Sequence, residues 1–377
     1  MRIPKDKELL AGIRAWVEVE TPTGHAPGLN HLMDMVGEAF TELGAAVERT
    51  PGRDGQGDHL LCRLPWRGAI PGDDVPGLLI LSHLDTVHAV GTLDVLPFRV
   101  EGDHAYGPGT SDMKGGAYIA YRAIRTLVEA EHETPLPVRY LFTSDEETGS
   151  ETSRDLIEAA AEHAKYVLVT EPARGGGKIV TGRRGVGRYG LSAKGRAAHA
   201  GTNHAAGRSA IRELARKVLE IEGKTDYERG VTFNIGRIWG GTTDNTVPEE
   251  AGMRIDLRFT DPADGPAMDA WLRSLTPDEP DVEIALTGGL NRPAYTKTNA
   301  IASLFEHAKG LAAEAGWVLE DLHTGGGSDG SFVAARVSTL DGLGVDGADA
   351  HTLNEHLYVS SLQPRMALMR RLLETLE

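Results

Sequence analysis

The 377-residue sequence has a single cysteine and no long apolar run. Because Cys62 has no second cysteine to pair with, no disulfide can form within the chain, and a metal site must use oxygen and imidazole ligands. No apolar stretch reaches the length of about 18 residues that marks a membrane-spanning helix. The amino terminus also lacks the apolar core of a signal peptide. We therefore expect a cytoplasmic protein that does not bind a membrane.

Positive charge is also scarce in this sequence. It contains 39 lysine and arginine residues against 55 aspartate and glutamate residues, and the formal net charge is -16. Such an excess of negative charge opposes binding to the phosphate backbone of nucleic acids and to anionic membrane surfaces. We therefore expect no nucleic-acid partner.

The hydrophobic pattern indicates two kinds of β-strand. Apolar or largely apolar runs, as at residues 78–81 and 138–143, are typical of strands covered on both faces, whereas residues 179–286 alternate apolar and polar positions, as in strands with one face in water. The pattern predicts an α/β fold with a mixed, mostly parallel sheet, built from residues 1–182 and 294–377 and interrupted by a smaller α+β (ferredoxin-like) domain at residues 183–293.

Helical spacing and apolar runs also predict the individual elements. Helices are expected at residues 5–20, 28–44, 116–131, 152–163, 208–222, 300–315 and 360–376, and strands at residues 60–64, 78–83, 138–143, 166–169, 188–193, 231–239, 252–259 and 337–340.

The strand at residues 78–83 runs into His83-Leu84-Asp85. Residues two apart in an extended chain project from the same face, so His83 and Asp85 are expected side by side at the carboxyl end of a buried strand. Ligand sites in α/β sheets form at this edge. A strand followed by an ordinary polar turn is the alternative interpretation.

Further histidines and carboxylates follow later strands in the same way: Asp112, Glu146, Glu147, Glu171 and His351. Two histidines with at least three carboxylates suit zinc, cobalt or manganese ions held in pairs, in which one carboxylate bridges ions about 3.5 to 4 Å apart. Glu146 and Glu147 point in different directions, so one can bind metal while the other takes a proton from water. With 55 acidic residues in the chain, adjacent glutamates also occur by chance on the surface.

Five ordered motifs extend this pattern over nearly the whole chain: residues 82–87 (SHLDTV), 106–116 (YGPGTSDMKGG), 143–150 (TSDEETGS), 170–172 (TEP) and His351. In order and spacing they resemble the di-zinc exopeptidase and aminoacylase family, which includes glutamate carboxypeptidase (carboxypeptidase G), acetylornithine deacetylase and succinyl-diaminopimelate desuccinylase. Residues 97–103, 292–295 and 324–329 resemble the glutamate carboxypeptidase branch most.

The resemblance implies a set of metal ligands around two zinc ions, for which cobalt or manganese can substitute: Asp112 between both ions, His83 and Glu171 on one, and Glu147 and His351 on the other. It also implies that Asp85 orients His83. Glu146 would be the general base that takes a proton from the water shared by the ions and later protonates the leaving amine.

The resemblance also implies substrate contacts in the inserted domain, which in this family usually carries the dimer contact, so we expect a homodimer. His199, in Ala197-Ala198-His199-Ala200-Gly201, would reach the partner subunit's active site and stabilise an oxyanion. Asn245 and Arg258 would bind the substrate's carboxylate, the arginine through two parallel bonds. Arg292 and Lys178 are further candidates, and solvated surface charge is the alternative for both.

Two features depart from this family pattern. Arg183 and Arg184 put two cations where glutamate carboxypeptidases are small and neutral, which fits an acidic substrate or salt bridges. Residues 326–330 (GGSDG) match the Gly-x-Ser-x-Gly motif of serine hydrolases, with Asp349 and His351 as formal partners of Ser328. Those two partners are only two residues apart, so they would lie on the same strand face and compete for His351. In the metal interpretation, Gly326 and Gly327 instead let the backbone approach the substrate.

We therefore expect a di-zinc hydrolase that cleaves the amide bond to a C-terminal amino acid with a free carboxylate, in the manner of glutamate carboxypeptidase. Its substrate would be a small peptide or an N-acyl amino acid. The alternatives are an N-acyl-amino-acid amidohydrolase with the same mechanism, a serine hydrolase that uses Ser328, and a non-catalytic zinc-binding protein that keeps the fold.

Overall fold

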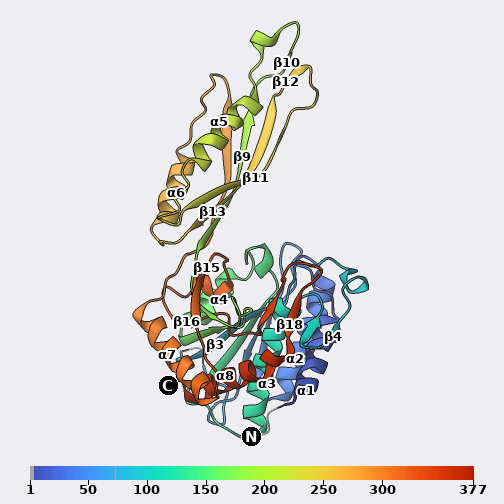
Figure 1. Ribbon diagram of the computed structural model, residues 1–377, viewed down its shortest axis with the longest axis vertical. Coiled ribbons are helices and arrows are strands. Elements are labelled where there is room, and N and C mark those ends of the chain that lie inside the picture. The colour runs from blue at the N-terminus through green and yellow to red at the C-terminus, as the bar shows by residue number, and fades with distance from the viewer. Residues whose placement is uncertain (1–3, 73) are drawn as a thin grey trace. The chain divides into compact units, whose positions relative to one another are not determined.

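The computed structural model describes residues 4–72 and 74–377, which form two compact units (Figure 1). Within the described chain, unit 1 comprises the residues up to Thr181 together with Lys297–His323 and Ser328–Glu377. Unit 2 comprises Gly182–Thr296 and the short loop Thr324–Gly327. The insert expected at residues 183–293 differs from unit 2 by a few residues at its ends and by this loop.

Unit 1 is built on a six-stranded mixed sheet. In spatial order its strands are β1 (Ala46–Thr50), β2 (His59–Arg63), β6 (Val138–Thr143), β3 (Gly77–His83), β7 (Ala164–Val169) and β16 (Ser338–Leu340). The pairs β6–β3, β3–β7 and β7–β16 are parallel, and the pairs β1–β2 and β2–β6 are antiparallel. The mixed, mostly parallel sheet expected from the sequence is confirmed.

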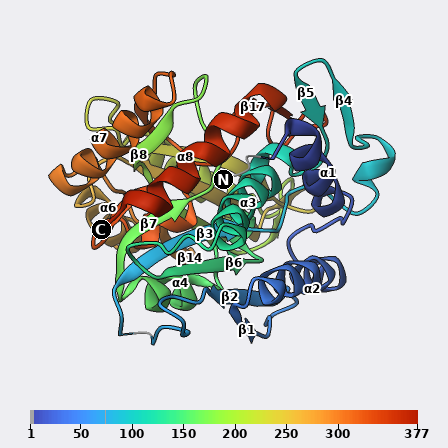
Figure 2. The same cartoon turned by 90° about the horizontal axis from the view of Figure 1, so that it is seen from below.

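Helices cover both faces of this sheet, which explains why β3 and β6 are buried along their whole length. The helices of unit 1 are α1 (Asp6–Val17), α2 (Ala26–Glu42), α3 (Gly115–Glu129), α4 (Arg154–Ala161), α7 (Asn299–Glu314) and α8 (Leu362–Thr375). Leu78 and Ile80 of β3 join the core formed by α1, α2, α3, α7 and α8, whereas Leu79 and Leu81 pack toward α4 on the other face. Figure 2 shows α3 and α8 packed side by side.

Unit 1 also contains short strands outside the main sheet. A small antiparallel sheet has the order β17 (Gly347–Ala348), β18 (His356–Tyr358), β5 (His104–Tyr106) and β4 (Arg99–Glu101). The strands β8 (Ile179–Arg183) and β15 (Asp321–Thr324) form a separate pair. The sequence pattern did not predict β1 or the small sheet, because strands of two to five residues carry too little periodicity.

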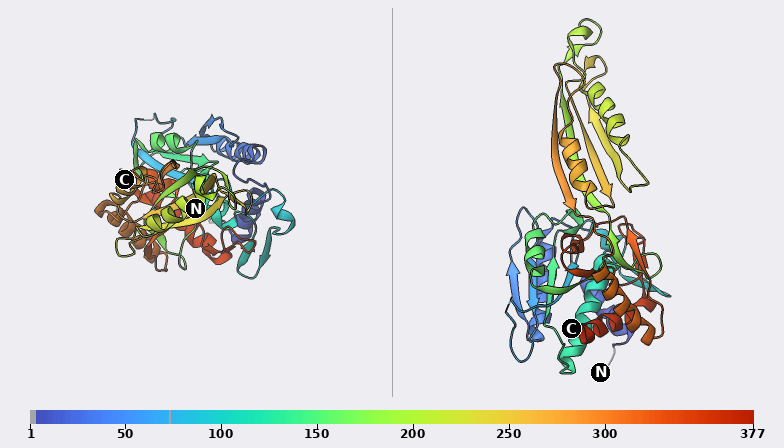
Figure 3. Two further views of the ribbon diagram at one scale, coloured as in Figure 1. Left: turned by 90° about the horizontal axis from the view of Figure 1, so that it is seen from above. Right: turned by 90° about the vertical axis from the view of Figure 1, so that its left-hand side faces the viewer.

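Unit 2 is an antiparallel sheet in the order β11 (Thr232–Gly240), β13 (Glu250–Phe259), β9 (Gly185–Lys194) and β14 (Glu283–Arg292). Alternate residues of β9 and β13 are buried against α5 (Ala210–Glu222) and α6 (Asp264–Arg273) on one face (Figure 3). The element order β9-α5-β11-β13-α6-β14 is that of a ferredoxin-like α+β unit, the kind expected for the insert, although neither α6 nor β14 was among the predicted elements. A two-stranded arm, β10 (Ala198–His199) with β12 (Thr246–Val247), extends from it.

The helix α6 was not predicted from the sequence, because Gly265 and Pro266 in its first turn resemble a loop. None of the helices in the described ranges combines the length and apolar character needed to cross a membrane.

Candidate metal centre and active site

Three parallel strands of unit 1 end at one edge of the main sheet. His83, at the end of β3, is in register with Thr143 of β6, and Leu81 is in register with Val169 of β7. Because the carboxyl ends of parallel strands lie level, the residues that follow them are gathered at this edge. His83, Glu146, Glu147 and Glu171 reach the site in this way.

Asp112 lies at the centre of these side chains. Its Oδ1 is 3.2 Å from Nε2 of His83, which is 3.7 Å from Oε1 of Glu171. Its Oδ2 is 3.5 Å from Nε2 of His351, which is 3.2 Å from Oε2 of Glu147. The two oxygens of one carboxylate therefore face two separate pairs, each made of one histidine and one glutamate.

The backbone around Asp112 is fixed by Glu355, a residue to which the sequence analysis gave no role. Glu355 is buried, and its carboxylate accepts hydrogen bonds from the backbone N–H groups of Gly109, Ser111 and Asp112 at 3.1, 2.9 and 3.0 Å. It also contacts Nε2 of His88 at 2.6 Å. Its position four residues after His351 was the only signal in the sequence.

Asp85 organises the turn that carries Glu146 and Glu147. The Asp85 carboxylate is fully buried and accepts hydrogen bonds from the backbone N–H groups of Glu146 and Glu147 at 3.2 and 3.1 Å, and from Oγ1 of Thr23 at 2.7 Å. Nδ1 of His83 lies 3.0 Å from the Asp85 carbonyl oxygen and 3.4 Å from Oδ1. Asp85 thus contacts His83, as expected, and also holds both glutamates, which was not.

His351 adopts an unusual backbone conformation. Its φ of 67° lies in the left-handed region that non-glycine residues rarely occupy. It lies in the loop between β17 and β18, and its side chain is half exposed. Strain of this kind persists where the surroundings demand a particular side-chain direction, here toward Asp112 and Glu147.

The electrostatics of the cluster show that it requires positive charge. Burial opposes protonation of His83, but contacts with Asp112 and Asp85 raise its pKa well above the ordinary value. Close contacts with Asp112 and Glu147 raise the pKa of His351 to about 10. Burial would raise the pKa of Asp112, but His351 and His83 lower it below its ordinary value. Protonated imidazoles therefore offset carboxylates that divalent ions would otherwise neutralise.

Glu147 fits a metal ion most directly. Its Oε1 is buried and has no hydrogen-bond partner among the described residues. Burial, together with the charges of Asp112 and Glu146, raises the pKa of Glu147 to about 7 in spite of His351. An orphaned carboxylate oxygen is costly unless a cation takes it up. Two groups of three side chains each bring their ligand atoms within 4.8 Å of one another. One group is His83, Asp112 and Glu147, and the other is His83, Glu146 and Glu171.

Unit 2 carries His199 and Asn245 on its two-stranded arm. His199 is exposed, and its Nδ1 accepts hydrogen bonds from the backbone N–H groups of Gly201 and Thr202 at 3.1 and 3.2 Å. This arrangement places the ring proton on Nε2, which can then donate outward. Asn245 lies beside it, because the Ala200 N–H bonds to the Asn245 carbonyl at 2.8 Å.

Arg258 lies at the opposite end of the same sheet. It is eight residues beyond Glu250 along β13, or roughly 27 Å at about 3.4 Å per residue. Glu250 is paired with Lys194, from which the chain continues to His199. The Arg258 guanidinium binds Asp256 through Nε and Nη2 at 2.7 and 2.9 Å. The structure therefore separates Arg258 from His199 and Asn245.

The other predicted cations have protein contacts. Arg183 is buried and donates from Nη1 to the carbonyls of Gly326 and Gly327 at 3.2 and 3.1 Å, so it supports the glycine loop. Lys178 pairs with Glu320 at 3.3 Å.

Two further arginines complete this group. Arg184 donates to the Gly230 carbonyl and to Oγ1 of Thr260. Arg292 is buried, and Gly327 packs against its side chain so closely that an added Cβ would lie 2.8 Å from its Cγ.

Arg174 was missed in the sequence. Its Nη2 lies 3.9 Å from Oδ2 of Asp112 and 3.8 Å from Oε2 of Glu171. The pattern gave no signal for it, because it stands in a glycine-rich turn after Glu171 with no motif of its own.

The serine-hydrolase interpretation is wrong. Ser328 is fully buried and its Oγ donates to Oδ2 of Asp341 at 2.5 Å, so the hydroxyl faces a carboxylate rather than a histidine. His351, the formal base, is directed at Asp112 and Glu147 instead. A nucleophilic serine needs a histidine within hydrogen-bond reach.

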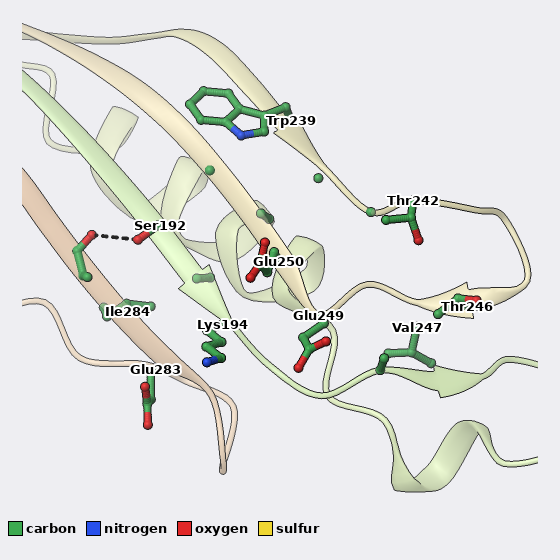
Figure 4. A pocket seen from close by; sticks show the side chains of 17 residues that line it. Ser192, Lys194, Trp239, Thr242, Thr246, Val247, Glu249, Glu250, Glu283 and Ile284 are labelled. Atoms are coloured by element: carbon green, nitrogen blue, oxygen red, sulfur yellow. Dashed lines mark hydrogen bonds between the residues drawn. The ribbon is translucent and has the colours of Figure 1, made fainter.

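A cavity of about 1040 Å³ lies in unit 2. Figure 4 shows Lys194, Trp239, Glu249, Glu250 and Glu283 around it. None of the candidate metal ligands lines it, and its size alone does not mark it as the active site.

Several known proteins resemble the chain in sequence or in fold. The sequence model of peptidase family M20/M25/M40 matches residues 79–375. Carboxypeptidase G2 from Pseudomonas sp. (strain RS-16) is 32% identical over 369 residues, which cover 95% of this chain and 86% of that protein. A succinyl-diaminopimelate desuccinylase from Albidiferax ferrireducens is 30% identical over 286 residues, 72% of each protein. A tripeptidase structure from Staphylococcus aureus subsp. aureus mu50 shares the fold, with a TM-score of 0.80 at 20% identity over 99% of both chains.

Removal of divalent metal should abolish activity and lower stability. Ions that bind only the folded state should stabilise it by about 2.7 kcal/mol at a free concentration 100 times Kd. Thermal unfolding with and without zinc, together with metal analysis, measures this effect. Asp112→Asn should lose most of the stabilisation, whereas the exposed control His31→Ala should keep it. A melting temperature indifferent to metal in the wild type would contradict the assignment.

Replacement of Glu355 should weaken metal binding from a distance. In Glu355→Gln, an amide N–H₂ faces backbone N–H donors, so we expect a 10- to 100-fold loss of metal affinity, about the effect of losing a residue that orients a ligand. Chelator competition measures it. The matched control is Glu213→Gln, because Glu213 is also buried and accepts the N–H groups of Asp278 and Glu279 in unit 2. Both variants should cost about 1–3 kcal/mol of stability, and equal metal affinity in both would contradict a role for Glu355 at the metal site.

Proposed function

The chain belongs to peptidase family M20/M25/M40 and is a metal-dependent hydrolase, and on that premise we propose that it cleaves the amide bond to an amino acid with a free α-carboxylate. The observation that carries this proposal is the arrangement around Asp112, whose two oxygens face two histidine–glutamate pairs. The similarity to carboxypeptidase G2 over 95% of the chain favours a carboxypeptidase of the glutamate-releasing kind.

In this proposal His83, Asp112, Glu147, Glu171 and His351 would hold two zinc ions: His83 and Glu171 for one, Glu147 and His351 for the other, and Asp112 for both. Bound divalent ions would supply Lewis acidity and lower the pKa of water. The donor set contains only imidazole and carboxylate groups, which suits zinc, and also cobalt or manganese.

Glu146 moves the proton in this proposal. Its backbone N–H is held by Asp85, and its side chain lies within ligand distance of His83 and Glu171, so its carboxylate is close to the place where water would react. Glu146 takes a proton from the attacking water and gives it to the nitrogen of the leaving amine. Each cycle returns Glu146 to its ionised form.

His199 acts on the site of a second subunit. Within unit 2, His199 and Arg258 are separated by more than the roughly 27 Å between Glu250 and Arg258, so one small substrate cannot contact both in the same chain. A homodimer in which the arm of one subunit serves the other removes this conflict. The exposed Nε2 of His199 would then donate to the oxyanion of the tetrahedral intermediate.

An N-acyl-amino-acid amidohydrolase is the second candidate. It shares the metal chemistry and the amine-side carboxylate, and it differs only in the acyl group. The 30% identity with a succinyl-diaminopimelate desuccinylase over 72% of each protein favours it. Rates on N-acyl, N-benzoyl and peptidyl derivatives of one amino acid separate the two candidates.

The variant Glu146→Gln should keep bound metal but lose at least about 1,000-fold in kcat, because a carboxamide cannot accept a proton from water. Turnover of an N-benzoyl or peptidyl glutamate substrate, with metal analysis of the same sample, measures both properties. The exposed control Glu133→Gln should match the wild type. Near-normal turnover by Glu146→Gln would reject this residue as the base.

Two inactive variants should restore each other if His199 acts on the neighbouring subunit. His199→Ala and Arg258→Ala should each lose most activity, and an exchanged equal mixture should recover about a quarter of the wild-type rate, since half of the dimers carry one intact site. Sedimentation should show whether the subunits pair in the mixture. A mixture no more active than its parts, although mixed dimers form, would show that both residues serve the same chain.

A further inference from the structure

Arg174 places a positive charge within a group of metal-ligand candidates. Its Nη2 lies 3.9 Å from Oδ2 of Asp112 and 3.8 Å from Oε2 of Glu171. These distances exceed those of hydrogen bonds, and within the described residues its guanidinium donates to no protein acceptor. Its side chain is 36% exposed, so it extends from the solvent side toward the metal site.

The turn that carries Arg174 is closely held. Its backbone N–H donates to the Lys178 carbonyl and its carbonyl accepts from the Lys178 N–H, both at 2.9 Å. The three residues between them are Gly175, Gly176 and Gly177, with φ of 55°, 80° and 94°, a conformation that side chains disfavour. The buried Arg365 donates to the Gly177 carbonyl. The backbone at Arg174 is therefore held in place by this turn.

Among the described residues, the ion-pair contacts of Arg174 are with two candidate metal ligands, Asp112 and Glu171. Metal ions held by Asp112 and Glu171 would take up the carboxylates that face it, and the guanidinium would be left with donors for another anion. The protein has a net charge of -16, and acidic residues crowd this site, so an anionic substrate meets repulsion that a cation at the site offsets. A planar guanidinium binds a carboxylate through two parallel hydrogen bonds.

We propose that Arg174 is a specificity residue that binds a second carboxylate of the substrate, in addition to the α-carboxylate. This inference rests on the proposed amide hydrolysis and deepens it, because it names dianionic N-acyl amino acids as the preferred class. The second carboxylate belongs either to the side chain of the released amino acid or to the end of the acyl group. The chemistry of recognition is the same in both cases.

Matched substrate pairs test the proposal with the metal-loaded enzyme. N-benzoylglutamate against N-benzoylglutamine varies the amine side, and N-succinylalanine against N-succinamoylalanine varies the acyl side, each exchanging only a carboxylate for a carboxamide. In Arg174→Ala, kcat/KM for the carboxylate member of one pair should fall about 10- to 100-fold, and for its carboxamide member by less than about threefold. The loss of kcat/KM in Arg174→Lys should lie between those of the wild type and Arg174→Ala, because lysine keeps the charge but lacks the planar guanidinium that makes two parallel hydrogen bonds.

The control variant is Arg154→Ala, which removes the same charge from an exposed arginine on α4 that pairs with Glu158. It should leave both pairs unchanged, and metal content should be equal in all variants. Equal losses on both members of each pair, or no loss on either, would overturn the proposal. The first result would mean that Arg174 serves a group common to all substrates.

A binding measurement keeps this inference separate from the proposed function. Calorimetry on metal-loaded Glu146→Gln should show glutamate or succinate bound at least about tenfold more tightly than its monoamide, and Arg174→Ala in that background should remove the difference. If the wild type hydrolyses none of the four amides, the proposed function fails, while calorimetry still decides on Arg174. If the amides are hydrolysed and the preference survives in Arg174→Ala, only the inference fails.

Discussion

The mutual proximity of carboxylates around Asp112 is the constraint on which the rest of unit 1 depends. Parallel strands bring Glu146, Glu147 and Glu171 to one edge of the main sheet, and the burial of Asp112 and Glu171 removes water that would screen these charges. Such a cluster is unfavourable by itself, and the raised pKa of Glu147 records the cost. Cations must offset the repulsion between these carboxylates, whether as protonated imidazoles or as metal ions. The need of this site for positive charge is thus a consequence of where the strands end.

Much of this arrangement could be predicted from the sequence. Largely apolar segments that end in polar side chains predicted β3 and β6 and the edge where His83 and Glu147 meet, since strand direction and the period of two suffice for that. Glu355 and Arg174 could not be predicted, because their roles depend on which backbone segment lies opposite them after folding. The helix α6 was missed for a local reason: Pro266 is favourable in a first turn but reads as a loop signal.

The arginines also show that the sequence alone does not reveal which contacts a side chain makes after folding. The sequence marks Arg183, Arg258 and Arg292 as candidates for binding an acidic substrate, but a guanidinium is available to a ligand only where protein acceptors leave donors unused. Arg183 holds the carbonyls of the glycine loop, and Arg258 is engaged by Asp256 at two donors. For Arg258 to bind a substrate carboxylate, that anion would have to compete with Asp256, or with the Gly325 carbonyl that accepts from Nη1 at 3.4 Å. Competition of this kind makes binding depend on the whole pocket, and residue type alone does not report it.

The acidic residues divide into two groups according to what their oxygens accept. Asp85 and Glu355 accept backbone N–H groups, and Asp145 accepts the N–H of Thr152 together with two hydroxyl groups, so these buried carboxylates are satisfied by the protein and hold loops in place. Asp112 and Glu147 instead face histidines and each other, and one Glu147 oxygen has no partner among the described residues. Acids of the first group fix the geometry, and acids of the second leave their lone pairs for a cation. The sequence pattern does not distinguish the two groups, but their positions in the fold do. Only a rigid frame of fully bonded carboxylates keeps the unsatisfied oxygens of the other group close together.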